Sequence, residues 1–169
     1  MNTKEQYIEQ LGLTPHAEGG WFKEVSHSTD RYFAPESNGE RYRYTSILFL
    51  LDTTSPSHLH QLNHDELWFY HVGQAITIHC ISPEGQYWQV KLGTDLANGE
   101  LLQYTVPQQT IFGAEIQSET GFSVVSCVVA PGFDYHDFIL SDRQQLLQKY
   151  PQLQEVINKM AVDKLVDRV

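Results

Sequence analysis

The sequence predicts an all-β protein, a sandwich or barrel of short strands, with a short helix before it and a helical tail after it. Three observations lead to this prediction. Short apolar runs follow one another from residue 42 to residue 129 at spacings near ten residues. Turn residues such as Pro56, Gly73 and Asn98-Gly99 close the runs. No helical pattern lies between them, which disfavours a parallel sheet with crossover helices.

Three elements are expected before residue 42. Thr3 suits the N-cap of a helix because the Gln6 side chain can return its hydrogen bond, and Gly12 and Pro15 are typical helix-ending residues. The stretch from 31 to 41 is polar and contains Pro and Gly, which is typical of a mobile surface loop. The predicted elements are a helix over 3–13, a strand over 21–26 and this loop over 31–41.

Eight strands and two helices are expected after residue 42. Each strand is a short apolar run rich in β-branched and aromatic residues and closed by turn residues. The predicted strands are 44–51, 57–62, 66–71, 75–81, 87–92, 101–106, 112–116 and 123–129. Two helices then begin near Ser141-Asp142 and at Pro151, both typical helix starts, and their apolar stripe predicts that the tail packs on the β domain.

The size and the charge of the chain narrow its function. With 169 residues it is long enough for one full hydrophobic core, so we expect a single domain over 1–169, with its core over 13–140 and a helical tail over 141–169. The formal net charge of −10 argues against nucleic acid as a partner, because phosphate binding requires clustered Lys and Arg. No apolar run approaches the ~20 residues that span a bilayer, so no membrane partner is expected.

The two cysteines indicate a reducing compartment. Cys80 and Cys127 form no Cys-x-x-Cys pair, and the residues from Met1 to Glu5 do not resemble a signal peptide. Both cysteines lie in apolar, strand-like runs, where a buried structural thiol is more common than a nucleophile. We therefore expect a cytoplasmic protein with two free thiols.

The most informative segment runs from Ser57 to Gly73. His58 and His60 are two residues apart, so on a regular strand they project from one face. Glu66 follows on the next predicted strand. Together, His58, His60 and Glu66 can bind a divalent metal such as Fe, Mn, Ni or Zn. The same groups can instead perform acid–base chemistry without a metal.

This segment resembles the first cupin motif, in which His-x-His is followed by Glu and then by Gly. His58, His60, Glu66 and Gly73 occupy these places, although the gap between His60 and Glu66 is one residue longer than usual. The resemblance implies a single double-stranded β-helix, the jelly-roll barrel of the cupins, with a pocket for a small molecule inside it.

Further landmarks resemble one branch of this superfamily, the cupin-5 family of small cupins. They recur in order over residues 13–140: Pro15-His16-Ala17-Glu18-Gly19-Gly20, Thr45 to Leu51, Leu59-His60, Asp65 to Trp68, Leu92-Gly93, Val106-Pro107 and Val129 to Phe138. Proteins of this kind are often described as sugar epimerases by analogy. Cupins also commonly pair through edge strands, so the resemblance implies a homodimer that binds a small-molecule ligand.

The second cupin motif departs from the usual pattern. It normally reads Pro-x-Gly-x-x-His, and its histidine is a further metal ligand. Here Pro107 is followed by Gln109 where Gly belongs and by Phe112 where His belongs. A site of three histidines and a glutamate cannot be built from these motifs. We therefore expect no cofactor, with a divalent metal on the three residues of the first motif as the alternative.

The resemblance also suggests roles for individual residues. Metal-independent cupin epimerases of sugar nucleotides use a histidine base, a supporting carboxylate and a tyrosine acid, which implies these roles for His60, Glu66 and Tyr70. Trp68 and Tyr70 follow Glu66 by two and four residues, so on a regular strand they share its face and are candidate pocket walls. Core packing explains these two aromatic residues nearly as well. The other candidate ligand-binding residues are Phe22, Glu24, Arg43 and Phe133.

His64, between Asn63 and Asp65, is an alternative metal ligand, although a solvated turn residue explains it better. The other five histidines have no partner at a meaningful spacing. A lone histidine is more often a structural residue than a catalyst, so these are interpreted as structural. They are His16, His27, His71, His79 and His136.

Two classes of function stay open. The first is an isomerase or epimerase that acts on a sugar or sugar-derived carbonyl compound through His60 and Glu66. Only Arg31, Arg41 and Arg43 are candidates for holding a diphosphate, so a small neutral or weakly charged substrate suits the acidic chain better. The second class is a non-catalytic cupin that binds or senses a small ligand. A metal-dependent cupin enzyme is the third alternative.

Overall fold

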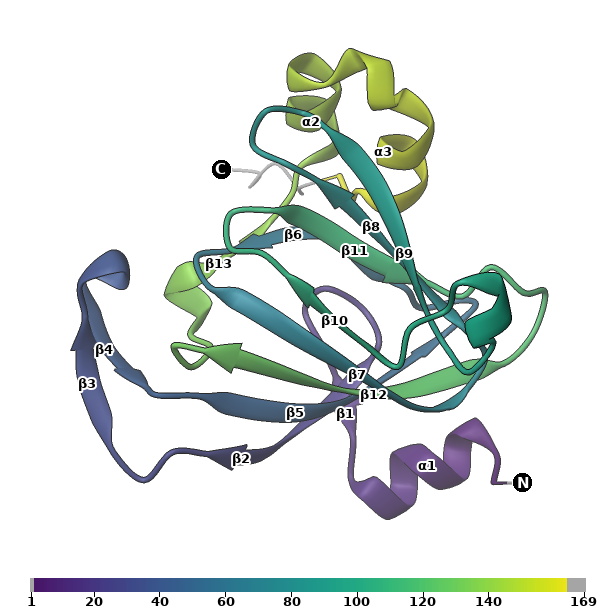
Figure 1. Cartoon of the computed structure of the whole chain (residues 1–169), viewed down its shortest axis with the longest axis horizontal. Coiled ribbons are helices and arrows are strands. Elements are labelled where there is room, and N and C mark those ends of the chain that lie inside the picture. Colours follow the sequence, from purple (N-terminus) through teal and green to yellow (C-terminus); the bar gives the residue numbers. More distant parts are fainter. Residues whose placement is uncertain (1, 164–169) are drawn as a thin grey trace, which may run out of the picture.

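Two antiparallel sheets face each other in the computed structural model, which describes residues 2–163 (Figure 1). The larger sheet has six strands in the order β1-β2-β5-β12-β7-β10, and the smaller has five in the order β13-β6-β11-β8-β9. From β5 to β13, consecutive strands cross between the two sheets, except for β8 and β9, which pair with each other, and this is the jelly-roll arrangement. The prediction of an all-β jelly roll with terminal helices is confirmed.

The eight predicted strands are all present, with ends that differ by a few residues. The larger sheet contains β1 (Thr14–Pro15), β2 (Trp21–His27), β5 (Thr45–Asp52), β7 (Asp65–Gly73), β10 (Gln103–Val106) and β12 (Phe122–Ala130). The smaller sheet contains β6 (Ser57–Leu62), β8 (Ile76–Ile81), β9 (Tyr87–Leu92), β11 (Ile111–Glu115) and β13 (Phe138–Leu140). Alternate residues of these strands point between the sheets, where Phe49, Trp68 and Phe112 are among the largest buried side chains.

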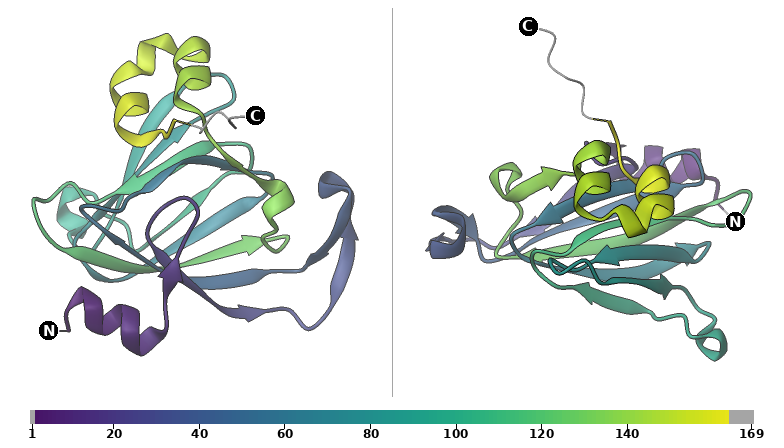
Figure 2. Two further views of the ribbon diagram at one scale, coloured as in Figure 1. Left: turned by 180° about the vertical axis from the view of Figure 1, so that it is seen from behind. Right: turned by 90° about the horizontal axis from the view of Figure 1, so that it is seen from above.

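Helices cover the outer faces of both sheets (Figures 1 and 2). The helix α1 (Lys4–Leu11) begins at the predicted capping box of Thr3 and Gln6, and its apolar residues pack near Leu50 and Val124 of the larger sheet. On the other side lie α2 (Arg143–Lys149) and α3 (Gln154–Met160), with the short 3-10 turn η4 (Pro151–Leu153) between them. Their apolar residues pack on the outer face of the smaller sheet, as the stripe predicts.

Residues 31–42 form a β-hairpin, where the sequence predicts a mobile loop. The strands β3 (Arg31–Ala34) and β4 (Gly39–Tyr42) pair across the 3-10 turn η1 (Pro35–Ser37), and the hairpin projects from the body of the molecule (Figure 1). A buried ion pair ties the hairpin down, because Arg41 Nε donates to Asp137 Oδ2 at 2.6 Å. The prediction was wrong because the partner of this polar residue lies far along the chain.

The cysteines are buried and free, as predicted. Burial raises the pKa of the Cys80 thiol to about 12 and that of the Cys127 thiol well above its usual value, so both thiols stay protonated at neutral pH. Within residues 2–163, no helix combines the length and the apolar character needed to cross a bilayer.

Candidate functional site

A cavity of ≈ 130 Å³ opens on the inner face of the larger sheet. The turn before β2 and the segment after β12 complete its wall. Its polar lining residues are His16, Glu18, Glu24, Thr45, Glu66 and Tyr135. Its apolar lining residues are Phe22, Ile47, Leu62, Cys127, Val129 and Phe133. We call this space the inner cavity.

The turn from His16 to Gly20 brings a histidine and a carboxyl group into the inner cavity. The backbone N–H of His16 donates to the Gly20 carbonyl at 3.0 Å, and the Glu18 carbonyl accepts from the His58 N–H of β6 at 2.7 Å. Gly19 has a φ of 108°, and a Cβ at this residue would collide with the Pro56 carbonyl oxygen. Only glycine fits such a backbone approach, which explains why two glycines follow Glu18.

Glu18 lies between two histidine rings. Its Oε2 atom is 3.3 Å from Nε2 of His60 and 3.5 Å from Nδ1 of His16, and its Oε1 atom accepts a hydrogen bond from the Ser57 hydroxyl at 2.8 Å. Glu18, Ser57 and His60 are all buried. The carboxyl partner of His60 is therefore Glu18 from the N-terminal turn.

The hydrogen bonds fix which ring nitrogens carry protons. Nδ1 of His60 lies 2.8 Å from the His58 carbonyl, so it is the donor and leaves Nε2 without a proton in the neutral ring. Nδ1 of His16 accepts from the Glu18 backbone N–H at 3.3 Å. The Oε2 atom of Glu18 thus faces two nitrogens that lack protons. A proton on this oxygen can be donated to His60 Nε2 at 3.3 Å, while His16 Nδ1 already accepts from the backbone.

Burial places that proton on the carboxyl group near neutral pH. It raises the pKa of Glu18 to about 7, against smaller opposing contributions from His16 and Ser57. Burial also lowers the pKa of His60 and of His16, which keeps both rings neutral. An aromatic shell maintains the low polarity, with the Phe112 ring 4.2 Å from the His60 ring and the Phe22 ring 4.5 Å from the His16 ring.

Glu66 is the second carboxyl group of the inner cavity. Its Oε2 atom accepts a hydrogen bond from the Trp68 indole nitrogen at 2.9 Å. Burial raises its pKa to about 7, and the neighbouring Glu18 carboxyl contributes in the same direction because two negative charges repel. Two carboxyl groups that share one buried site therefore titrate near neutrality.

His58 and His60 do not share a face. Phe112 pairs with His60 and Ala114 pairs with Ser57, so two residues of β6 oppose one residue of β11 in a β-bulge. The bulge turns His58 outward, where its Nδ1 atom lies 3.2 Å from the Met160 carbonyl of α3. The spacing argument assumed a regular strand, and the structure does not bring His58, His60 and Glu66 together.

The other predicted residues fall into two groups. Phe22, Glu24 and Phe133 line the inner cavity, as Glu66 does. Trp68 is fully buried and lies behind Glu66. Tyr70 donates its hydroxyl hydrogen to the Gly73 carbonyl at 2.6 Å and does not line the inner cavity.

Arg43 also lies away from the inner cavity. Its Nε atom is 2.7 Å from Asp30 Oδ2, and its guanidinium group stacks over the Tyr32 ring of the hairpin. About 61% of its side chain is exposed. Arg31 likewise stacks over the Tyr42 ring, and Arg41 is paired with Asp137, so none of the three arginines lines the inner cavity.

Phe112 occupies the place that the second cupin motif gives to a histidine. It lies directly opposite His60 in the sheet, and its ring packs on the His60 imidazole. Gln109, where the motif has glycine, has a φ of 63° in the left-handed region. An apolar ring therefore packs on His60 where the motif has a metal-ligating side chain.

Sequence reasoning missed His16, Glu18 and Tyr135. His16 had no spacing partner because its partner, Glu18, contacts it through a turn and because His60 lies 44 positions further along the chain. The available signal was the Gly19-Gly20 pair, since adjacent glycines after a carboxylate indicate a backbone forced close to another segment. Tyr135, about half exposed, stacks near the His16 ring at 6.3 Å.

Comparison with known proteins gives the family. The family model described as Cupin superfamily (DUF985) matches residues 5–141. An uncharacterized protein of Saccharomyces cerevisiae is 32% identical over 152 residues, which cover 79% of this chain and 72% of that protein.

Two solved structures are similar over almost the whole chain. A hypothetical protein from Leishmania major is 42% identical with a TM-score of 0.90, and the match covers 96% of this chain and 100% of that one. A protein from Shewanella oneidensis is 41% identical with a TM-score of 0.89, covering 97% and 100%. Together with the jelly roll and the partly kept cupin motifs, these matches show that the chain belongs to this family of the cupin superfamily.

Proposed function

We propose that the inner cavity catalyses proton transfer on a small hydroxylated carbonyl compound, as an isomerase or epimerase of a sugar or sugar-derived substrate. One observation carries the proposal: Glu18 and Glu66 line one small cavity, are both buried, and both titrate near pH 7. At neutral pH such a pair holds about one proton, so one group is a base while the other is an acid.

The reaction uses the pair in two steps. The ionised carboxyl group takes a proton from the carbon next to the substrate carbonyl, while the protonated group gives its proton to the carbonyl oxygen, which forms an enediol. Return of a proton to the other carbon, with loss of the neighbouring hydroxyl proton, gives the isomer. Return to the opposite face of the first carbon gives the epimer. Only protons move, so no co-reactant is needed.

His60 acts as a positioning residue in this scheme. It does not line the inner cavity, and its Nε2 atom faces Glu18 from behind. Its fixed tautomer holds an acceptor against the Glu18 carboxyl, which stabilises the protonated form. The base that touches the substrate is then a carboxylate, in place of the histidine suggested by the resemblance.

The substrate is proposed to be uncharged or weakly charged. The polar wall of the inner cavity contains three carboxylate residues and no Lys or Arg. A phosphate or diphosphate group would have no cation to bind among these lining residues. This supports a free sugar or a sugar-derived carbonyl compound over a sugar nucleotide.

The residues proposed for a metal do not fit one. His58 lies outside the inner cavity, and Phe112 replaces the ligand of the second motif. Within residues 2–163, no three His, Cys, Asp or Glu side chains are grouped as metal ligands. We propose that the chemistry needs no metal. Protein purified without a histidine tag should contain well below one metal ion per chain, and one equivalent of Fe, Mn, Ni or Zn would contradict this.

A second candidate function is ligand binding without catalysis. The inner cavity of ≈ 130 Å³ is smaller than the roughly 300 Å³ at which ordinary ligand pockets begin, and much of its wall is apolar. For either function, these features favour a small ligand. A sensing role would then use the pH-dependent charge of Glu18 and Glu66 to tune affinity.

Solvent deuterium exchange separates the two functions. The protein is incubated in deuterated buffer with a panel of small keto-sugars and aldoses, and incorporation beside the carbonyl is followed by NMR. We expect exchange with at least one substrate, reduced about 10²- to 10⁴-fold in Glu18→Gln and Glu66→Gln. Glu119→Gln, an exposed residue outside the site, is the matched control.

Two outcomes would overturn catalysis. No exchange with any substrate, together with saturable binding of one of them, would support the binding function. Equal exchange rates in the wild type and in both glutamine variants would show that other groups move the proton.

A further inference from the structure

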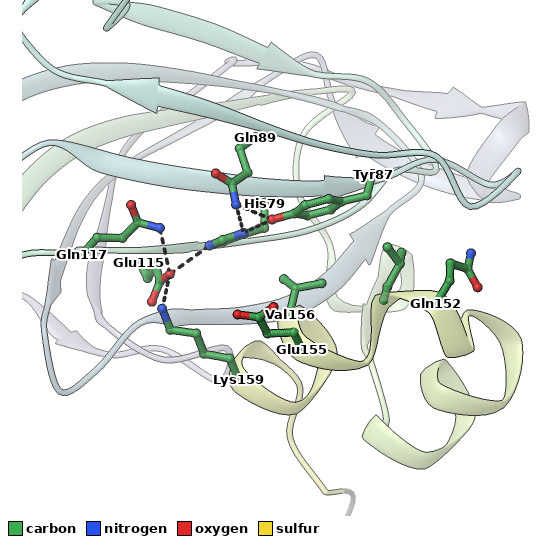
Figure 3. A pocket seen from close by; sticks show the side chains of 10 residues that line it. His79, Tyr87, Gln89, Glu115, Gln117, Gln152, Glu155, Val156 and Lys159 are labelled. Atoms are coloured by element: carbon green, nitrogen blue, oxygen red, sulfur yellow. Dashed lines mark hydrogen bonds and ion pairs between the residues drawn. The ribbon is translucent and has the colours of Figure 1, made fainter. Parts of the chain in front are cut away.

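A second hollow lies on the outer face of the smaller sheet, beside the C-terminal helices (Figure 3). Its volume is ≈ 330 Å³, more than twice that of the inner cavity. Strands β8, β9 and β11 form one side, and η4 and α3 form the other (Figure 3). We call it the outer groove. Its volume reaches the range of about 300–1,000 Å³ typical of small-molecule sites.

A continuous polar network runs along the floor of the outer groove. His79 is buried, its Nδ1 atom lies 2.8 Å from the Tyr87 hydroxyl, and its Nε2 atom lies 3.0 Å from Glu115 Oε1. From α3, Lys159 Nζ donates to the same Oε1 atom at 2.6 Å, and Gln117 Nε2 donates to it at 3.4 Å. Figure 3 shows these side chains converging from the sheet and the helix.

The network leaves specific groups open toward the hollow. All three donors to Glu115 meet one oxygen, so its Oε2 atom has no protein partner among residues 2–163. Within the same range, the side chains of Glu155 and Gln152 line the groove and make no hydrogen bond to the protein. Lys159 retains further N–H groups beyond the one that Glu115 accepts. Open acceptors and open donors therefore line the same hollow.

The charges in the outer groove disfavour an anionic ligand. Burial alone would raise the pKa of Glu115, but hydrogen bonds from Lys159 and His79 hold it below its usual value, so the carboxylate is ionised. Burial lowers the pKa of His79, which keeps that ring neutral. Two glutamates then face a single lysine, and an added carboxylate or phosphate would meet net negative charge.

Docking of α3 accounts for one polar contact of the groove, the Lys159–Glu115 ion pair, and otherwise rests on apolar packing. The helix is held on the sheet by buried apolar residues, with Ile157 and Met160 packed in one cluster with Leu59 and Ile111. The polar network lies beside this contact. Helix packing alone therefore leaves the open donors and acceptors unexplained.

We propose that the outer groove binds a neutral polyhydroxylated molecule about the size of a monosaccharide. A hydroxyl group both donates and accepts, so several hydroxyls on one ring match the open Gln, Glu and Lys groups of the groove. Leu153 and Val156 supply an apolar strip for the C–H face of such a ring. This binding site is separate from the inner cavity and does not depend on its chemistry.

NMR titration tests the site directly. The full chain, labelled with ¹⁵N, is titrated with glucose and myo-inositol as neutral probes and with glucosamine and glucuronate as charged analogues. We expect saturable shifts of the side-chain amide signals of Gln89, Gln117 and Gln152 with a neutral probe, and weaker shifts with glucuronate. With myo-inositol, which has no carbonyl group for the proposed reaction, we expect no matching shift at residues of the inner cavity.

Substitution identifies the groups that bind. Gln117→Leu should weaken the neutral probe about tenfold, the loss expected when one or two hydrogen bonds are removed. Gln103→Leu, an equally exposed glutamine on β10, should leave the affinity unchanged. Because both residues are exposed, neither change threatens the fold, and thermal melting checks this.

Three results would overturn the proposal. They are no saturable shift with either neutral probe, equal affinity in Gln117→Leu and the wild type, or binding of glucuronate or glucosamine alone. The last result would assign the outer groove to a charged ligand instead.

Discussion

The inner cavity and the outer groove each join a buried histidine to a glutamate, yet their carboxyl groups differ in charge. In the inner cavity, Glu18 faces two neutral histidine rings, and burial raises its pKa to about 7. In the outer groove, Glu115 also meets a lysine, and its pKa lies below the usual value. At Glu115, the hydrogen bonds from Lys159 at 2.6 Å and from His79 outweigh the effect of burial, whereas at Glu18 burial is the larger effect.

The two regions also differ in how the backbone supports them. The groove residues His79, Tyr87 and Glu115 lie on regular paired strands, where a side chain's direction follows from its register. In the inner cavity, Glu18 depends on a turn that two glycines make possible. The inner cavity should therefore be the more sensitive of the two to backbone changes.

The largest expected effect is the loss of the turn in Gly19→Ala. The new Cβ would meet the Pro56 carbonyl oxygen, which belongs to the backbone and cannot rotate away, at a φ of 108°. We expect the free energy of unfolding to fall by about 3 kcal/mol or more, from the collision added to the strain. Urea denaturation measures it.

Gly99→Ala is the matched control for this change. Gly99 has a φ of 83°, but nothing lies within 4 Å of the added Cβ. Its cost should be only about 1–2 kcal/mol, the penalty of the left-handed backbone. An equal decrease in the free energy of unfolding of the two variants would show that the collision with the Pro56 carbonyl oxygen adds nothing to the backbone strain.

The next effect is a change in how stability depends on pH. The pKa of Glu18 and of Glu66 rises on folding from 4.5 to about 7, so the native state binds protons more tightly. Stability from these groups is complete below pH 4.5 and is lost as pH rises through 7. Glu66→Gln should remove the part of this loss that comes from Glu66 and so stabilise the protein at pH 8 by about 3 kcal/mol. The hydrogen bond from Trp68 is kept, because the amide oxygen still accepts it.

Glu18→Gln should act in the same direction. Its amide N–H groups can donate to the bare nitrogens of His16 and His60, which the carboxylate cannot do. The pH profile of denaturation of each variant, compared with that of the wild type, provides the measurement. Lower stability of both variants at pH 8 would contradict the assigned protonation.

Glu115→Gln in the outer groove should alter a different pH range. The pKa of Glu115 is lowered on folding, so its contribution is present above pH 4.5 and is lost as pH falls through the native pKa. The substitution should therefore destabilise the protein at pH 7 and flatten only the acid side of the profile. If Glu115→Gln and Glu66→Gln changed the pH dependence of stability in the same way, the two regions would not differ in the charge of their glutamates.

A smaller effect is expected for Lys159→Met. About half of the lysine side chain is exposed, so solvent screens the ion pair, and its loss should cost about 0.5–1 kcal/mol at pH 7. The informative readout is the pKa of Glu115, followed by ¹³C NMR of its carboxyl carbon. We expect it to rise, because burial remains while the strongest donor is lost. An unchanged pKa would show that His79 alone keeps the carboxylate ionised.

The last prediction concerns the tautomers of His60 and His79 and needs no substitution, since both are measured in the wild type. His60 should carry its proton on Nδ1, which donates to the His58 carbonyl. His79 should carry it on Nε2, which donates to Glu115, while Nδ1 accepts from the Tyr87 hydroxyl. Long-range ¹⁵N NMR distinguishes the two forms, and one shared tautomer would contradict the hydrogen-bond assignment.

Much of the fold could be predicted because its signals are local. Strand periodicity and turn residues lie within about ten positions of one another, and so does the capping box of Thr3 and Gln6. The hairpin from Arg31 to Tyr42 was missed because its anchor, the Arg41–Asp137 ion pair, joins residues 96 positions apart. The polar residues of this segment, together with its Pro and Gly, indicated a mobile loop instead.

The jelly roll, the buried thiols and the position of Glu66 could be predicted from the sequence, since each follows from local patterns or from a family motif. The partners of the site residues could not, because they depend on contacts between distant segments. A β-bulge turned His58 away from His60, and a glycine turn brought Glu18 to His60 instead. In the outer groove, Glu115 contacts both His79 and Lys159, which lies on the distant helix α3. Register shifts and long-range contacts decide which charged side chains lie together, and residue spacing within one strand does not predict either of them.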